Sequence, residues 1–149
     1  MSLDDLYREV ILDHYRAPRN RGSLDDATVV VELNNPLCGD EITLYLRIDD
    51  ERVTQVRFDG RGCSISQASA SMMTEAVKGK SVGEALDLIR RFKGMLRSEL
   101  PASEADLGEL EALQGVAKFP VRIKCAVLSW EALRQGLEGK RGRISSVVE

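Results

Sequence analysis

Alternation of apolar and polar residues between residues 28 and 58 limits the possible folds of this chain more than any other feature. Glu41 to Ile48 places every second residue, from Ile42 onward, on one apolar face, and Arg52 to Phe58 repeats the pattern after an acidic turn. A period of two is typical of a β-strand with one buried face. The valine-rich stretch Thr28 to Leu33 predicts a further strand. Because only residues 49–51 separate the second and third strands, we expect them to form an antiparallel hairpin.

On both sides of these strands the apolar residues recur with helical spacing. Three helices are expected directly from this period, and a fourth from the capping box at Ser81 and Glu84, which opens an apolar stripe running to Phe92. The three are Leu3 to Tyr15, Ser64 to Lys78, and Arg122 to Leu137.

Two further segments carry weaker signals. Glu99 to Leu113 contains a proline and many acidic residues, so we expect an exposed connection with a short helix. The tail from Gly139 is rich in Gly, Lys and Arg and is expected to be frayed. A helix, three strands and a run of helices predict an α+β fold, in which a three-stranded antiparallel sheet carries helices on one face.

The overall composition excludes several classes of protein. A chain of 149 residues with 43% hydrophobic residues is expected to form one domain, residues 1–149, with its own core. The net charge of -3 provides no basic footprint for nucleic acid. We find no apolar run of roughly 18 residues, as a membrane span requires, and no signal peptide at the acidic N-terminus. We therefore expect a cytoplasmic protein with no membrane or nucleic-acid partner.

The three cysteines are the candidate functional residues. An odd number cannot pair fully within the chain, and in a reducing compartment thiols serve metals or redox chemistry more often than disulfides. Cys38 is followed by Asp40 in the turn before the second strand, Cys63 follows the third strand, and Cys125 lies at the start of the last helix. Such strand ends and helix starts can share one edge of a sheet. Three thiolates and a carboxylate make a donor set for tetrahedral zinc.

Spacing alone leaves simpler interpretations open. Cysteine is among the most buried residue types, so all three could belong to the core, and Asp40 could be a turn or cap residue. The 25 residues from Cys38 to Cys63 and the 62 from Cys63 to Cys125 match no zinc finger. Cys38 and Cys63 nevertheless lie in glycine-bearing turns, which favours a site assembled by the fold.

Three motifs together closely resemble the IscU/NifU-type family of iron–sulfur cluster assembly proteins. They are Ile11 to Asn20 (ILDHYRAPRN), Asn35 to Asp40 (NPLCGD) and Gly60 to Ser71 (GRGCSISQASAS). Two features resemble the SufU branch of that family: the long stretch from Leu96 to Phe119, and Lys124 before the last cysteine, where IscU-type scaffolds carry a histidine.

The resemblance implies an SufE/NifU-like fold, a zinc site and a function. Zinc would be held by Cys38, Asp40, Cys63 and Cys125. The chain would accept persulfide sulfur on Cys38 from a SufS-type cysteine desulfurase and pass it to downstream iron–sulfur assembly proteins. In this family picture a desulfurase histidine takes a place on zinc and releases the Cys38 thiolate. Such a chain is a sulfurtransferase, or sulfur carrier, that acts with the desulfurase.

Two alternatives remain open from the sequence. The same four residues could ligate a transient iron–sulfur cluster on a scaffold that passes it to apo-proteins, because thiolates are the usual cluster ligands. A purely structural zinc in a non-catalytic domain is the other. His14, the one histidine, is expected to be a packed, hydrogen-bonded residue, and Arg61 either supports the Cys63 thiolate or forms a surface ion pair.

Overall fold

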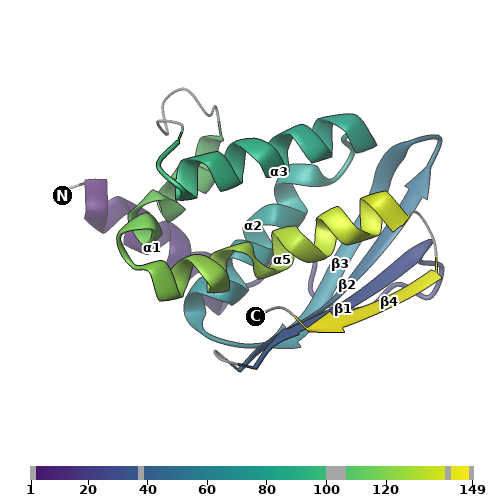
Figure 1. Cartoon of the computed structure of the whole chain (residues 1–149), viewed down its shortest axis with the longest axis horizontal. Helices are drawn as coiled ribbons and strands as arrows, with labels where there is room; N and C mark the ends of the chain where they lie inside the picture. The colour runs from purple at the N-terminus through teal and green to yellow at the C-terminus, as the bar shows by residue number, and fades with distance from the viewer. Residues whose placement is uncertain (1–2, 37–38, 100–106, 140–141, 148–149) are drawn as a thin grey trace.

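The computed structural model describes residues 3–36, 39–99, 107–139 and 142–147. Figure 1 shows helices gathered on one side of a single sheet. The elements in chain order are α1 (Leu3–Arg16), β1 (Val29–Asn35), β2 (Asp40–Asp49), β3 (Arg52–Arg61), α2 (Ser64–Val77), α3 (Val82–Leu96), η1 (Gly108–Lys118), α5 (Pro120–Gly139) and β4 (Gly142–Val147).

The first three strands form the expected antiparallel meander. Val31 of β1 lies opposite Leu44 of β2, which lies opposite Phe58 of β3, and all three side chains are fully buried. The β2–β3 hairpin turns through Asp50 and Glu51, which both have positive φ, at 51° and 60°. Positive φ at both central residues is the mark of a type I′ turn, whose twist matches that of the strands. The predicted α+β class and the predicted hairpin are confirmed.

The tail beyond Gly139 is the first correction. Instead of fraying, residues 142–147 form β4, which pairs in parallel with β1 and completes the sheet order β3-β2-β1-β4. A long connection that contains α2, α3, η1 and α5 separates β3 from β4. A strand that pairs in parallel needs a long connection of this kind to return to the same end of the sheet. The prediction failed because this short segment is ordered by pairing with the edge of β1, which is more than a hundred residues away in the sequence.

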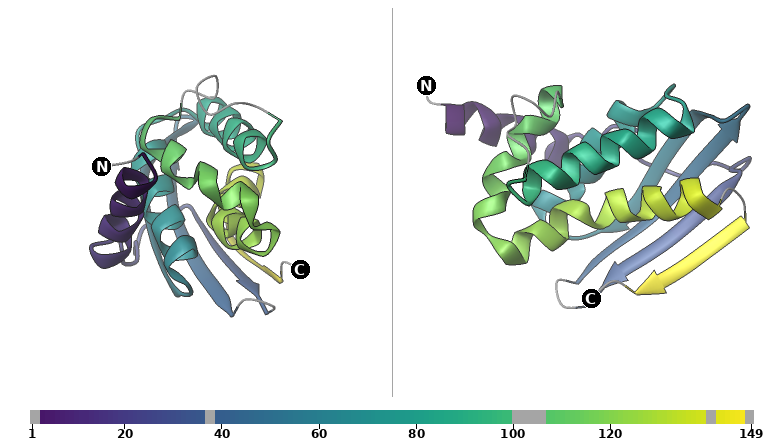
Figure 2. Two further views of the ribbon diagram at one scale, coloured as in Figure 1. Left: turned by 90° about the vertical axis from the view of Figure 1, so that its left-hand side faces the viewer. Right: turned by 45° about the horizontal axis from the view of Figure 1, so that its top comes forward.

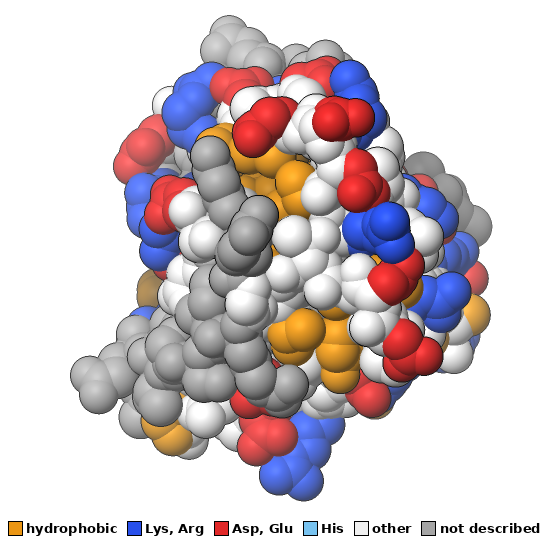
Figure 3. All heavy atoms as spheres, turned by 90° about the vertical axis from the view of Figure 1, so that its right-hand side faces the viewer, with side chains coloured by type: hydrophobic (Ala, Val, Ile, Leu, Met, Phe, Trp, Pro, Cys, Tyr) orange, Lys and Arg blue, Asp and Glu red, His pale blue; other side chains and the backbone are white. Residues whose placement is uncertain are grey.

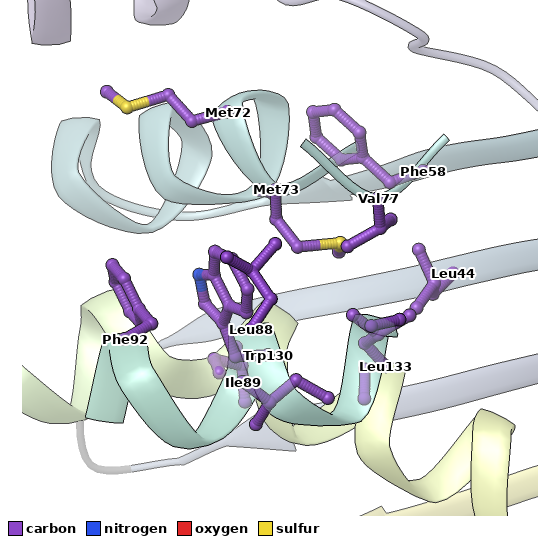
Figure 4. Packing of buried hydrophobic residues seen from close by; sticks show 14 of the residues in the cluster. Leu44, Phe58, Met72, Met73, Val77, Leu88, Ile89, Phe92, Trp130 and Leu133 are labelled. Atoms are coloured by element: carbon purple, nitrogen blue, oxygen red, sulfur yellow. The ribbon is translucent and has the colours of Figure 1, made fainter. Parts of the chain in front are cut away.

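The helices cover one face of the sheet, as predicted. α2 and α5 lie against the strands, and α3 lies on the outer side of α5 (Figures 1 and 2). Figure 4 shows Phe58 and Leu44 from the sheet facing Met73 from α2 and Leu133 from α5. The Phe92 ring of α3 stacks on Trp130 of α5, with centroids 4.3 Å apart. Both aromatic side chains are fully buried, so their apolar area anchors α3 and α5 to the core.

The connection between α3 and α5 is the second correction. The expected short helix is present as the 3₁₀ helix η1, which overlaps the segment Glu99 to Leu113 at residues 108–113, but a row of apolar residues along it is buried and not exposed. Residues 100–106 of that segment lie outside the described residues. The row recurs every three residues, which is the period of a 3₁₀ helix, and acidic residues between its members hide it from a search for the 3.6 period. Its members are Leu107, Leu110, Leu113 and Val116.

The outer surface carries mixed charge at the end of the molecule seen in Figure 3. Lys and Arg side chains alternate with Asp and Glu side chains there, and hydrophobic areas between them are small. Among the helices of the described residues, none has the length and apolarity that a membrane crossing needs.

Candidate metal centre

Three of the four predicted site residues converge in the structure. One donor atom from each of Asp40, Cys63 and Cys125 lies within 4.8 Å of the others. Asp40 is the first residue of β2, Cys63 caps α2, and Cys125 lies in α5. α5 begins at the end of the sheet where β2 begins and β3 ends (Figure 1), which is why residues so distant in sequence meet there. The fourth, Cys38, lies outside the described residues.

Cys63 occupies the N-cap of α2. Its backbone is extended, with φ -71° and ψ 169°, and its sulfur accepts a hydrogen bond from the backbone N–H of Ser66 at 3.5 Å. The Ser66 hydroxyl returns a bond to the Cys63 carbonyl at 3.1 Å. Unpaired N–H groups and the helix dipole both favour negative charge at this end of a helix. The sulfur of Cys63 therefore lies at the positive end of the α2 dipole.

Asp40 is buried, with 1% of its surface exposed. Its Oδ1 accepts the backbone N–H of Cys63 at 3.0 Å. Its Oδ2 has no hydrogen-bond partner within the part of the chain that the structure describes. A buried carboxylate oxygen without a partner is costly, and a cation beside it removes that cost. The donor set therefore fits a metal ion: one oxygen is held by the backbone, the other has no partner among the described residues, and a carboxylate oxygen of Asp40 lies within 4.8 Å of a sulfur from each cysteine.

Arg122 is a site residue that sequence analysis missed. The charge of the Cys63 thiolate, then hydrogen bonding to Cys125, raise the pKa of the Arg122 guanidinium above its usual value. Arg122 precedes Cys125 by three residues in α5, and this spacing puts two side chains on one helix face. That spacing was the available signal. Arg122 therefore places a fixed positive charge beside both sulfurs.

The structure also shows the contacts of Arg61 and His14, the two other residues that the sequence analysis singled out. Arg61 forms the surface ion pair that was one of its two interpretations, with its Nε 3.2 Å from Glu41 Oε2. His14 is a packed residue, as predicted: it is 4% exposed, and its Nδ1 lies 2.8 Å from the Ser71 hydroxyl. Its Nε2 contacts Glu109. Neither nitrogen of His14 is available to a metal at the cysteine site.

The fold and the site together define a class: a small α+β protein with two cysteines and a buried carboxylate gathered at one end of its sheet. Comparison with known proteins identifies the family. Residues 6–126 match the NifU-like N terminal domain. The chain belongs to this family, as the sequence motifs indicated.

Individual relatives match over nearly the whole chain. The zinc-dependent sulfurtransferase SufU of Bacillus subtilis (strain 168) is 52% identical over 141 residues, which are 95% of each chain. The iron-sulfur cluster assembly scaffold protein IscU of Streptococcus pyogenes serotype M1 is 46% identical, over 91% of this chain and 85% of that protein. The crystal structure of FiSufU from Fervidobacterium islandicum AW-1 is 34% identical and superposes with a TM-score of 0.83, covering 91% of this chain and 99% of that one.

Proposed function

We propose that this chain is a zinc-dependent sulfurtransferase of iron–sulfur cluster assembly, acting as one domain that accepts sulfur from a cysteine desulfurase. The convergence of Asp40, Cys63 and Cys125 within 4.8 Å carries the proposal. The 52% identity to the Bacillus subtilis sulfurtransferase, over 95% of this chain, supports it.

In this proposal zinc is held by Cys38, Asp40, Cys63 and Cys125. Four donors, three of them sulfur, suit tetrahedral zinc, and bound zinc keeps coordinating thiols deprotonated at neutral pH. The chain's own groups add positive potential around the same sulfurs. The α2 N-terminus faces Cys63, and Arg122 lies beside Cys63 and Cys125. Asp40 makes the centre exchangeable, since a carboxylate is a weaker partner for zinc than a fourth thiolate.

Sulfur transfer needs no external oxidant or reductant. The Cys38 thiolate attacks the terminal sulfur of the desulfurase persulfide and forms a new S–S bond. The bond between that sulfur and the desulfurase cysteine breaks, and the desulfurase cysteine leaves as a thiolate. The proton of the transferred hydropersulfide moves with its sulfur. Attack by a thiolate on one sulfur of an S–S bond, with the other leaving, is the chemistry of thiol–disulfide exchange.

The donor in this scheme is a SufS-type cysteine desulfurase, and the receivers are downstream iron–sulfur assembly proteins. The donor must bring its persulfide to the end of the sheet where α5 begins.

A second candidate function is a scaffold that holds an iron–sulfur cluster on the same residues. The Streptococcus pyogenes relative, 46% identical, is named as such a scaffold. Thiolates and an oxygen ligand can hold a cluster as well as zinc. Lys124, in the place of the histidine of IscU-type scaffolds, favours zinc. A structural zinc in a domain without transfer activity is the third candidate.

Elemental analysis and the visible spectrum of anaerobically purified protein separate the first two candidates. We expect one zinc per chain and no visible absorption. Iron with sulfide and a brown chromophore would establish the scaffold instead.

Cys38→Ala separates the sulfurtransferase from a structural zinc protein. We expect the variant to fold but to return desulfurase turnover to that of the desulfurase alone, because the attacking thiolate is gone. Cys63→Ala is the comparison variant, and its defect should include loss of zinc. Stimulation by Cys38→Ala at the wild-type level would show that Cys38 is not the acceptor.

A further inference from the structure

Gly62 immediately precedes Cys63, and its backbone does not explain why it is glycine. The nearby Gly60 has φ +139°, in the region that side chains rarely adopt. Gly62 is not among the glycines with positive φ. A positive φ therefore does not account for the glycine at position 62, but the space around it does.

That space is filled by the Asp40 carboxylate. A Cβ added at Gly62 would lie 2.4 Å from Asp40 Oδ1, 3.0 Å from Asp40 Cγ and 2.4 Å from the Ser66 hydroxyl. Contacts below 3.0 Å force one partner to move. The carboxylate therefore lies directly against the Gly62–Cys63 peptide, in the position from which Oδ1 accepts the Cys63 N–H.

The orientation of Asp40 depends on this contact. The Cys63 N–H holds Oδ1 at 3.0 Å, Oδ2 has no partner among the described residues, and one oxygen of this carboxylate lies within 4.8 Å of the sulfurs of Cys63 and Cys125. If the carboxylate moved off the peptide, the hydrogen bond would be lost and Oδ2 would change direction. Groups that orient a ligand in this way act on metal affinity without touching the metal.

We propose that Gly62 is a positioning residue for the metal centre: the absence of a side chain at position 62 lets the Asp40 carboxylate rest on the peptide and point one oxygen at the ion. The inference deepens the proposed function and rests on its zinc site. In this inference the fourth ligand is a carboxylate oxygen of Asp40, and the carboxylate occupies space that a side chain at position 62 would fill.

Zinc affinity, measured by competition with a chromogenic chelator, tests the inference in a double-mutant cycle. The proteins are the wild-type chain, Gly62→Ala, Asp40→Ala and the double variant. We expect Gly62→Ala to lower zinc affinity by about 10- to 100-fold, as changes to groups that orient metal ligands do. In the Asp40→Ala background the same change should have almost no further effect, because the carboxylate it displaces is gone.

Gly83→Ala is the matched control, since a Cβ at Gly83 meets nothing within 4 Å and its φ is also not positive. Zinc affinity should be unchanged in it. Equal affinity in wild type and Gly62→Ala would overturn the inference, and so would an equally large loss in the Asp40→Ala background. Hydrogen exchange of the Cys63 amide gives a second readout. Exchange should be faster than in the wild type in Gly62→Ala and unchanged in Gly83→Ala.

A further variant covers the case in which Gly62→Ala folds poorly. Adding Ser66→Ala removes the hydroxyl, so that the remaining close contact of the new methyl is with Asp40. This pair should fold and still lose zinc affinity, whereas full recovery would mean that Ser66 and not Asp40 was displaced. All these readouts are independent of sulfur transfer. A wild-type chain that accepts no sulfur would therefore defeat the proposed function and leave this result standing.

Discussion

Two clusters in this molecule bring together reactive residue types from distant segments, and they differ in how their polar atoms are satisfied. The metal centre draws Asp40, Cys63 and Cys125 from β2, the N-cap of α2 and α5. The histidine cluster draws His14, Ser71 and Glu109 from α1, α2 and η1.

In the histidine cluster both ring nitrogens of His14 are engaged, and the Ser71 hydroxyl also accepts the Arg19 N–H at 2.8 Å. In the metal centre, Asp40 Oδ2 is buried without a partner in the described residues. A closed network stabilises the fold and has no capacity left for a ligand, whereas a buried carboxylate with one unsatisfied oxygen, in a cluster with two sulfurs, is stabilised by a cation. Satisfaction of polar atoms therefore distinguishes the candidate metal centre from the histidine cluster.

Metal removal should produce the largest difference between the clusters. Zinc bound only to the native state stabilises it by about 4 kcal/mol at a thousandfold excess over Kd. For a chain of this size that amounts to roughly 10 °C in the midpoint of thermal unfolding. We expect a strong chelator to lower the midpoint by about this amount in calorimetry. The same chelator should not shift Cys125→Ser, and an unchanged wild-type midpoint would mean that the metal contributes nothing to the fold.

Asp40→Asn should have the next largest effect. It should lower zinc affinity and leave the fold and the histidine cluster unchanged. The amide keeps an oxygen to accept the Cys63 N–H but replaces the anionic Oδ2 with a group that cannot ligate zinc. Zinc affinity is expected to fall by at least about tenfold, or roughly 1.4 kcal/mol. Chelator competition measures the affinity, and circular dichroism checks the fold. Wild-type affinity in this variant would remove Asp40 from the ligand set.

His14→Phe should show the opposite behaviour. It keeps a ring in the buried space but deletes both hydrogen bonds, and we expect a loss of about 1–3 kcal/mol in the free energy of unfolding. Zinc content should stay at the wild-type level, because His14 does not face the centre. Urea unfolding with parallel metal analysis checks both parts. Tyr15→Ala, at an exposed neighbour on α1, is the control and should stay within about 0.5 kcal/mol. Zinc loss in His14→Phe would show that the clusters are coupled.

The smallest effect is expected at Glu131, in a third and partly exposed network. Hydrogen bonding from Arg134, and secondarily from Lys93 at 2.8 Å, lowers the pKa of Glu131 to about 2. A lowered pKa means that the carboxylate contributes stability above about pH 4.5, and that this contribution is lost as the pH falls toward 2. Because solvent screens this partly exposed network, we expect the Glu131 carboxylate to contribute about 1 kcal/mol to the free energy of unfolding.

Urea unfolding of wild type and Glu131→Gln between pH 2 and 7 measures the contribution of Glu131. The variant should be less stable at pH 7, and the difference should shrink as the pH falls. A constant difference across this range would contradict the assignment of the low pKa to Glu131.

Much of the fold was predictable from local patterns. The alternation around Leu44 and Phe58 determined the hairpin, and the capping box at Ser81 and Glu84 is present with both of its hydrogen bonds. The three sequence motifs indicated the family, and the one around Cys38 named Asp40 as a ligand candidate. Such features are readable because the residues that cause them lie within a few positions of one another.

Long-range contacts decided what the sequence left open. β4 forms because it can pair with the edge of β1. Leu110 and Leu113 of η1 are buried in the core, but their spacing of three residues does not match the period of an α-helix, so the sequence pattern did not indicate it. The meeting of Asp40, Cys63 and Cys125, the place of Arg122 beside the two sulfurs and the room that Gly62 leaves for a carboxylate are likewise tertiary facts. The sequence by itself determined which donors are available. Only packing of strands and helices could determine which donor atoms face one another, because that geometry depends on residues far apart in the chain.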